Sequence, residues 1–265
     1  MNLLASARFH TTVAQLRQLP RDGVPEVAFV GRSNAGKSSA INALCQRRRL
    51  AFASRTPGRT QALNYFAVGP VDRDVGYLVD TPGYGYASAP QEVKKTWDQL
   101  GGRYLQTCKS LHGVVLIDDI RREITDRDRA LIGWIAPHVP LLAVASKCDK
   151  LNRAERVRAC RAIAAQIGES REAGSFAVIG FSSTDLIGVD AVREHIQRWL
   201  TIEPATDEPA ADAPAPAPTE GVSGAAASLP AGTPDATVTS PSPSSIGVRP
   251  SSSTADRDIT GQEPS

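Results

Sequence analysis

The chain has few cysteines, no long apolar run and no apolar segment near its start of the kind that directs secretion. Its four cysteines do not fall into the paired spacings of metal sites, so we expect reduced thiols. No apolar run approaches the roughly 20 residues that a helix needs to span a bilayer, and residues 1–20 lack a signal-peptide core. These absences exclude a disulfide-stapled scaffold and predict a cytoplasmic protein without a membrane span.

Aromatic residues are absent from the last 65 residues, which hold 11 of the 19 prolines of the chain. The same stretch carries nine acidic and two basic residues, a net charge of −7, whereas residues 1–200 carry a net charge of +9. A segment rich in Ala-Pro and Ser-Pro pairs buries too little apolar surface to offset its conformational entropy. We therefore expect residues 201–265 to be a disordered acidic tail, and the basic remainder favours a polyanionic partner such as RNA.

The chain does contain a complete phosphate-binding loop (P-loop). The motif G-x-x-x-x-G-K-[ST] is matched at every required position by Gly31, Arg32, Ser33, Asn34, Ala35, Gly36, Lys37 and Ser38. An apolar run at 27–30 precedes the loop and a helical pattern at 39–44 follows it, which is the context that the motif requires. Backbone N–H groups of such a loop cradle phosphates, Lys37 adds positive charge, and Ser38 offers a hydroxyl to Mg²⁺.

A second motif, D-x-x-G, follows the apolar run at 75–79 and consists of Asp80, Thr81, Pro82 and Gly83. A carboxylate at the carboxyl end of a parallel strand can hold Mg²⁺ through water. The backbone N–H of Gly83 can contact a γ-phosphate and so sense whether that phosphate is present. Placed after a P-loop, this motif predicts a nucleoside triphosphatase.

Two further segments favour guanine over adenine. Ser146-Lys147-Cys148-Asp149 resembles the [NT]-K-x-D element, whose carboxylate accepts hydrogen bonds from the guanine edge while the lysine stem packs on the base. Ser146 departs from that pattern, since asparagine or threonine is usual there, and we expect slightly weaker nucleotide binding. Phe181-Ser182-Ser183 resembles the last GTPase motif, whose backbone contacts the guanine oxygen. The alternative, a P-loop kinase or ATPase, would leave Asp149 without a role.

Apolar runs alternate with helical patterns over residues 23–200, which predicts an α/β fold of three layers with a mostly parallel central sheet. With the motifs above, this fold resembles a P-loop NTPase of the small-GTPase type. Strands are expected near 26–30, 62–68, 75–79, 113–118, 140–145 and 175–180. Helices are expected near 37–46, 90–108, 125–136, 152–167 and 188–200, the third of them with a capping box formed by Thr125 and Asp128. Residues 1–22 are expected to add a short strand and turn at the sheet edge.

Together with Thr56-Pro57-Gly58-Arg59-Thr60-Gln61, these motifs resemble the pattern of the EngB family of bacterial P-loop GTPases, related to the Era, EngA and TrmE types. The resemblance covers about residues 5–200, and T-P-G-R-T-Q and D-T-P-G-Y-G-Y-A are its most specific parts. It implies that Gly58, Arg59 and Thr60 belong to the first switch. Thr56 and Thr60 are both candidates to join Ser38 and Asp80 at Mg²⁺, and the family pattern P-G-R-T favours Thr60. The resemblance also implies GTP and GDP as ligands, a role in assembly of the large ribosomal subunit, and a requirement in cell division and septation.

Tyr84 occupies the position at which many small GTPases carry a glutamine that orients the attacking water. We therefore expect slow unassisted hydrolysis, with Lys37, Thr60, Gly83 and Asn34 as the candidate catalytic residues. In related GTPases an asparagine at the position of Asn34 helps hold K⁺ beside the phosphates, so K⁺ is a further candidate cofactor. The alternative is that Asn34 only shapes the loop.

The sequence leaves two descriptions of the function open. In one, GTP hydrolysis drives a step in the assembly of the large ribosomal subunit. In the other, the chain is a nucleotide-gated binder of RNA or protein, and hydrolysis only resets it. Five arginines between the P-loop and the second motif fit RNA contact and an ordinary solvated loop equally well: Arg47, Arg48, Arg49, Arg55 and Arg59. The expected partner is a large-subunit precursor, its rRNA or its proteins, and we expect a monomer away from the ribosome.

Overall fold

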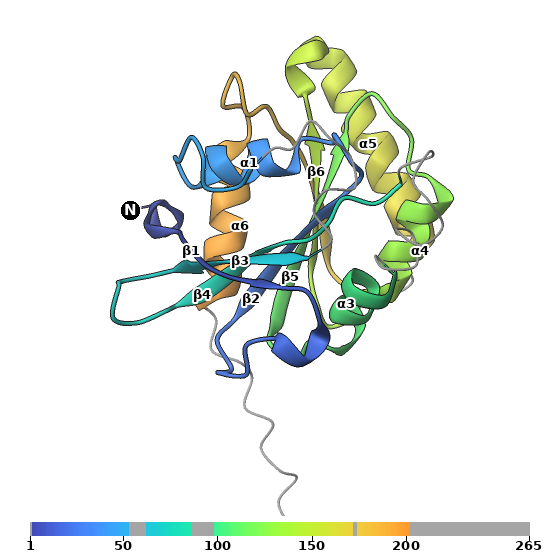
Figure 1. The fold of residues 1–265 in the computed structure, drawn as a ribbon. Helices are drawn as coiled ribbons and strands as arrows, with labels where there is room; N and C mark the ends of the chain where they lie inside the picture. The colour runs from blue at the N-terminus through green and yellow to red at the C-terminus, as the bar shows by residue number, and fades with distance from the viewer. Residues whose placement is uncertain (1, 53–61, 86–97, 172–173, 202–265) are drawn as a thin grey trace, which may run out of the picture. The chain divides into compact units, whose positions relative to one another are not determined.

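The computed structural model describes residues 2–52, 62–85, 98–171 and 174–201. Its centre is a seven-stranded sheet in the order β1-β3-β4-β2-β5-β6-β7 (Figure 1). The strands are β1 (Arg8–Val13), β2 (Glu26–Gly31), β3 (Leu63–Val68), β4 (Gly76–Asp80), β5 (Leu111–Asp119), β6 (Leu141–Ser146) and β7 (Phe176–Gly180). Strand β3 pairs antiparallel with β1 and β4, whereas β4, β2, β5, β6 and β7 pair in parallel.

The central strand β2 is buried over its whole length because both faces of the sheet are covered. Its side chains alternate between the two faces. Val27 and Phe29 join one buried cluster, and Ala28 and Val30 join the other. A continuous apolar run therefore forms a strand here, and its carboxyl end delivers the P-loop to the edge of the sheet.

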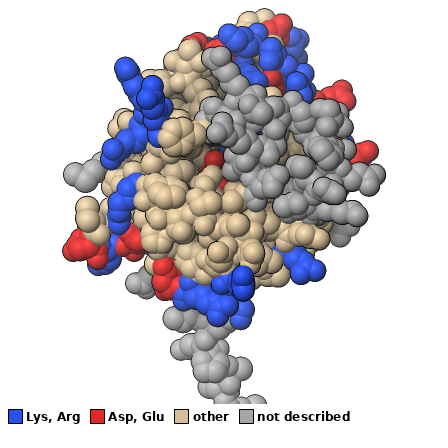
Figure 2. All heavy atoms as spheres, viewed as in Figure 1, with Lys and Arg blue, Asp and Glu red and all other residues tan. Residues whose placement is uncertain are grey.

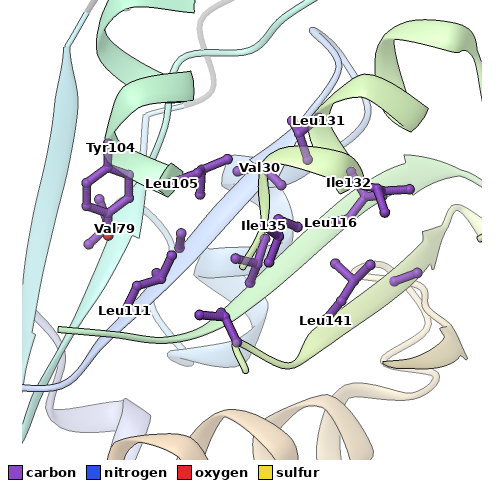
Figure 3. Close-up of a cluster of buried hydrophobic side chains, with 14 of the residues drawn as sticks. Val30, Val79, Tyr104, Leu105, Leu111, Leu116, Leu131, Ile132, Ile135 and Leu141 are labelled. Carbon is purple, nitrogen blue, oxygen red and sulfur yellow. The ribbon is translucent and has the colours of Figure 1, made fainter. Parts of the chain in front are cut away.

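Helices cover the two faces unequally. Helices α1 (Lys37–Leu44) and α6 (Val189–Thr201) pack on one face, and α3 (Arg103–Thr107), α4 (Asp126–Trp134) and α5 (Arg153–Ser170) pack on the other. On the second face, Leu131, Ile132 and Ile135 of the α4 region lie against Val30 and Leu116 of the sheet (Figure 3). Shorter helical turns span Leu3–Ser6, Leu16–Gln18, Asp98–Gly102 and Cys148–Lys150.

Two helices begin at capping boxes. The Thr125 hydroxyl accepts from the backbone N–H of Asp128 at the start of α4, and the Asp128 carboxylate accepts from the backbone N–H of Thr125. Asn152 and Glu155 form the equivalent pair at the start of α5. Each box satisfies backbone donors that a helix start leaves without partners, and so fixes where the helix begins.

The predicted fold class is confirmed, and each predicted strand lies within two residues of its expected bounds. Helix α1 ends at Leu44 rather than at 46, since Gln46 takes a left-handed conformation with φ 54°. Of the helix expected over 90–108, residues 98–107 are described, as a π-helical turn followed by α3. The stretch 5–20 holds β1 at the sheet edge. The tail from residue 202 onward lies outside the described residues. No helix among the described residues is long and apolar enough to cross a membrane.

Candidate nucleotide-binding site

The P-loop connects β2 to α1 through a backbone that turns back on itself. Asn34 has φ 66° and Gly36, the residue before α1, has φ 103°. The value at Gly36 is left-handed, where a side chain would be strained, so glycine is required at this turn. The turn leads directly into the N-terminus of α1, where backbone N–H groups and the helix dipole favour an anion.

Lys37 and Asp80 meet at the mouth of this loop. The ammonium nitrogen of Lys37 lies 2.5 Å from Oδ1 of Asp80, and both side chains are largely buried. Asp80 comes from the carboxyl end of β4, which pairs with β2 so that Asp80 is opposite Phe29. Ser38 is the second residue of α1, and its hydroxyl lies 3.4 Å from the carbonyl of Phe52. The lysine, the carboxylate and the hydroxyl predicted from the sequence therefore lie at the same edge of the sheet.

The residues after Asp80 run alongside the P-loop. Thr81 is fully buried, and its N–H and its hydroxyl both donate to the carbonyl of Phe29, at 3.1 and 2.8 Å. A side chain at Gly83 would lie 2.9 Å from Oγ of Ser33 and 3.0 Å from its Cα, so only glycine permits this approach. The D-x-x-G segment is thus in direct contact with the middle of the P-loop.

The S-K-C-D segment is joined to the P-loop by two side chains. The hydroxyl of Ser146 donates to the carbonyl of Ala35 at 2.6 Å, and Nζ of Lys147 donates to the carbonyl of Asn34 at 3.0 Å. Lys147 has φ 59°, which turns the chain sharply at the end of β6. These contacts bring together two motifs that lie 111 and 113 residues apart in the sequence.

Asp149 lies beside the F-S-S segment. Its carboxylate pairs with Lys150 at 3.0 Å, and hydrogen bonds from Lys150 and from the Ser182 hydroxyl hold its pKa below the ordinary value. The Phe181 N–H donates to the carbonyl of Ala145 at 2.8 Å, and the Cys148 N–H donates to the carbonyl of Phe181 at 3.0 Å. Asp149 is therefore an ionised acceptor at neutral pH, supported by the loop that follows β7.

Two acids at the end of β5 belong to the site, although the motifs did not reveal them. Asp119 accepts from Arg121 at 2.7 Å and from Lys147 at 3.1 Å, and these bonds hold its pKa well below the ordinary value. Asp118 is buried, and burial together with the charge of Asp128 raises its pKa to about 6. The signal that located Asp80, an acid at the carboxyl end of a parallel strand, could also have located this pair.

Tyr84, the residue that replaces the usual glutamine, points into the protein. Its side chain is 2% exposed, and its hydroxyl donates to Oδ1 of Asp128 on α4 at 2.7 Å. Burial and the charge of Asp128 raise the pKa of Tyr84 well above the ordinary value, so it remains a hydrogen-bond donor. Among the other predicted site residues, Gly58, Arg59 and Thr60 lie outside the described residues.

The comparisons with known proteins agree on one family. A family model described as 50S ribosome-binding GTPase matches residues 26–147. A probable GTP-binding protein EngB from Paraburkholderia phymatum is 52% identical over 202 residues, which cover 75% of this chain and 92% of that protein. A probable GTP-binding protein EngB from Burkholderia thailandensis is 49% identical over 213 residues, 79% of this chain and 97% of that protein.

A solved structure adds support for the fold. Era in complex with MgGDPNP and nucleotides 1506–1542 of 16S ribosomal RNA matches with a TM-score of 0.52 and 21% identity, over 70% of this chain and 60% of that chain. The P-loop, the adjacent D-x-x-G segment and the S-K-C-D loop that it contacts occur together in one α/β domain. With relatives about half identical over nearly their whole length, these features show that the chain belongs to the EngB family of P-loop GTPases.

Proposed function

We propose that the chain binds GTP and GDP across the carboxyl edge of its sheet, with the phosphates in the P-loop and the guanine at Asp149. The observation that carries this proposal is the pair of contacts from Ser146 and Lys147 to the carbonyls of Ala35 and Asn34. These contacts hold the proposed phosphate-binding and base-binding segments against each other. The backbone N–H groups of residues 31–38 would surround the phosphates, and Lys37 would neutralise their charge.

Asp149 would select guanine. An ionised carboxylate can accept hydrogen bonds from two neighbouring donors on the guanine edge, and adenine offers no such pair. The low pKa of Asp149 supports this role, since a protonated carboxyl would lose part of its acceptor capacity. Backbone groups near Ser182 and Ser183 would contact the guanine oxygen, and the Lys147 stem would cover the base.

The residues present fit Mg²⁺. Ser38 and Asp80 provide a hydroxyl and a carboxylate, the oxygen donors that Mg²⁺ prefers when it is shared with substrate phosphates. The ion pair between Lys37 and Asp80 supports this assignment, because it brings the carboxylate proposed to bind the metal into contact with the lysine proposed to bind phosphate. Thr60 is proposed as a third ligand from the family pattern. Bound Mg²⁺ would neutralise charge on the phosphates as the terminal P–O bond breaks.

Hydrolysis would be slow without a stimulating partner. Tyr84 cannot orient a water molecule at the γ-phosphate, because its hydroxyl is buried against Asp128. Gly83 would donate its N–H to the γ-phosphate, Lys37 would stabilise developing charge, and Thr60 would close over the metal. Asn34 is proposed to help hold K⁺ beside the phosphates, in place of an arginine finger.

The partner that we propose is a precursor of the large ribosomal subunit, with consequences for cell division and septation. The description of the matching family as ribosome-binding GTPases and the positive charge of residues 1–200 support this assignment. Lysine and arginine side chains gather over the loop after α1 and at one end of α5 (Figure 2). Arg47 and Arg48 also line a groove of about 710 Å³ together with Ser183 and Arg193. We further propose that the chain acts in the cytoplasm and is a monomer away from the ribosome.

Titration with GTP, GDP and ATP, each with and without Mg²⁺, tests the nucleotide assignment. We expect micromolar or tighter binding of both guanine nucleotides and at least about 100-fold weaker binding of ATP. ATP binding as tight as GTP binding would overturn the assignment of the base pocket. Single-turnover hydrolysis with and without large-subunit precursors then separates the two descriptions of the cycle. Strong stimulation supports an assembly GTPase, and GTP-dependent binding without stimulation supports a nucleotide-gated binder.

A further inference from the structure

We propose that Tyr84 and Asp128 form a positioning pair that holds Gly83 against the P-loop and so sets the ratio of the affinities for GTP and GDP. This inference rests on the proposed function, in which Gly83 contacts the γ-phosphate. It gives a role to a buried tyrosine and a buried acid that the nucleotide motifs do not use.

The backbone of Tyr84 is hydrogen-bonded to the P-loop. The N–H of Ser33 donates to the carbonyl of Tyr84 at 2.9 Å, and the N–H of Tyr84 donates to the carbonyl of Gly31 at 3.3 Å. These bonds form a short parallel bridge between Arg32 and Tyr84. Tyr84, the residue immediately after Gly83, is therefore hydrogen-bonded to the P-loop through both its N–H and its carbonyl.

The side chain of Tyr84 is buried between the sheet and α4. The ring of Tyr84 lies in the buried cluster that includes Val30, Leu116 and Leu131, between the sheet and α4. Its hydroxyl reaches Oδ1 of Asp128, which is fully buried. A hydrogen bond from a neutral donor to a buried carboxylate is stronger than one between two neutral groups.

The carboxylate of Asp128, which accepts from Tyr84, is itself held in place by Thr125. Oδ2 of Asp128 accepts from the Thr125 N–H at 2.8 Å and from the Thr125 hydroxyl at 2.6 Å. The capping box of α4 therefore orients the carboxylate, and each of its two oxygens has a separate partner. Tyr84 is anchored to the rigid start of a helix rather than to a loop.

Loss of the anchor should affect the binding of GTP more than the binding of GDP. The N–H of Gly83 would contact the γ-phosphate, so its position affects GTP binding and has little effect on GDP binding. Without the anchor, the backbone at 83–85 can move away from Ser33, and part of the free energy of GTP binding must restore it. A purely structural role for Tyr84 would instead lower stability and leave the ratio of the two affinities unchanged.

The test compares Tyr84→Phe with Tyr65→Phe in the full chain. The first variant keeps the buried ring and removes only the hydroxyl that contacts Asp128. The second is a matched control, because the buried Tyr65 hydroxyl donates to the carboxylate of Glu26 at 2.9 Å, at the start of β2 and away from the P-loop. Both variants lose one hydrogen bond from a buried tyrosine to a buried carboxylate.

Affinities for GDP and for a non-hydrolysable GTP analogue are measured by titration with Mg²⁺, beside thermal unfolding. For Tyr84→Phe we expect the analogue affinity to fall about 3- to 10-fold, with GDP affinity within about twofold of the parent chain. Asp128→Asn loses the charge, and an asparagine oxygen that faces Tyr84 turns the amide nitrogen toward the Thr125 N–H, so this variant also weakens the anchor and should lower the same ratio. Tyr65→Phe should lose stability with no change in the ratio.

An unchanged ratio in Tyr84→Phe, with a stability loss equal to that of Tyr65→Phe, would overturn the positioning role. An equal fall in the ratio in both tyrosine variants would also overturn it, because the effect would then be general. Failure of the parent chain to bind either guanine nucleotide would instead overturn the proposed function. The failures of the two claims are therefore distinguishable.

Discussion

Burial of the ionised Asp118 side chain lowers the free energy of unfolding by an amount that can be measured. Its side chain lies at the end of β5, its residue is 6% exposed, and one oxygen accepts from the N–H of Asp119 at 2.9 Å. The other oxygen has no hydrogen-bond partner among the described residues. Burial and the nearby charge of Asp128 oppose ionisation, whereas the Asp119 N–H and the charge of Arg32 favour it. The first pair of effects prevails, and the pKa of Asp118 is raised.

The rise predicts the size and sign of a stability effect. Each pKa unit corresponds to about 1.4 kcal/mol, so a rise from 3.8 to about 6 means that ionised Asp118 lowers the free energy of unfolding by about 3 kcal/mol at neutral pH. Because the folded-state pKa lies above that of the unfolded chain, the folded chain binds the proton first as the pH falls. The loss of stability is therefore full well above pH 6, shrinks as the pH falls through 6, and is absent below 3.8.

The perturbation is Asp118→Asn, which keeps an acceptor for the N–H of Asp119 and removes the charge. We expect the free energy of unfolding at pH 8 to rise by about 1–3 kcal/mol, less than the full effect if the new amide lacks a partner. In a domain of this size each kcal/mol corresponds to a rise of about 2–4 °C in Tm. At pH 4.5, where the folded parent chain is already mostly protonated at this position, the gain should fall below half.

The assay is thermal or urea unfolding of the parent chain and the variant at both pH values, with the difference between them as the readout. Asp119→Asn is the control of opposite sign. Its carboxylate is paired with Arg121 and Lys147 and has a lowered pKa, so its contribution to stability is present above the unfolded pKa and is lost at acidic pH. That variant should be destabilised at pH 8. A destabilised Asp118→Asn at pH 8, or a gain equal at both pH values, would refute the reasoning.

The remaining predictions concern the nucleotide. Asp149→Asn should weaken GTP binding by about tenfold or more and shift preference toward xanthosine nucleotides, because the amide offers the complementary donor; unchanged GTP affinity in a titration would contradict the base assignment. Lys37→Ala should weaken GTP and GDP by about 100-fold and leave the preference for guanine over adenine intact; a loss that alters base preference would contradict a phosphate role. GTP turnover should be faster in K⁺ than in Na⁺ at equal ionic strength, and Asn34→Ala should remove the difference; equal rates in the parent chain would rule out the cation role.

The fold could be predicted from the sequence because most of its strands are continuous apolar runs. In a chain that alternates such runs with helical patterns, runs such as 27–30 and 141–145 predict buried strands of a sheet that is covered on both faces. The P-loop and Asp80 could be predicted for a related reason. Both belong to short motifs that can be recognised from the local sequence. The carboxyl ends of parallel strands lie at one edge of the sheet, so the two motifs are expected to lie close together.

Contacts between distant residues could not be predicted in this way. Tyr84 and Asp128 are 44 residues apart, and nothing in either neighbourhood signals that they meet. The sequence around Tyr84 shows only that it lacks an amide to orient water, because the burial of its side chain depends on where α4 packs. Asp119 differs, because an acid at the carboxyl end of a parallel strand can be found in the sequence. Its contact with Lys147, 28 residues further along the chain, cannot.

Ser146 shows how a departure from a family pattern can still preserve a contact. The sequence predicts weaker nucleotide binding, because serine is smaller than the usual asparagine or threonine. In the structure its hydroxyl is buried and lies 2.6 Å from the carbonyl of Ala35, so the short side chain reaches the P-loop directly. Lys147, the next residue, donates to the carbonyl of Asn34, which precedes Ala35 in the P-loop. Two consecutive side chains of the S-K-C-D segment thus contact two consecutive carbonyls of the P-loop, and a shift of either loop would disturb the other. On the proposed function, base recognition and phosphate binding would therefore be coupled through Ser146.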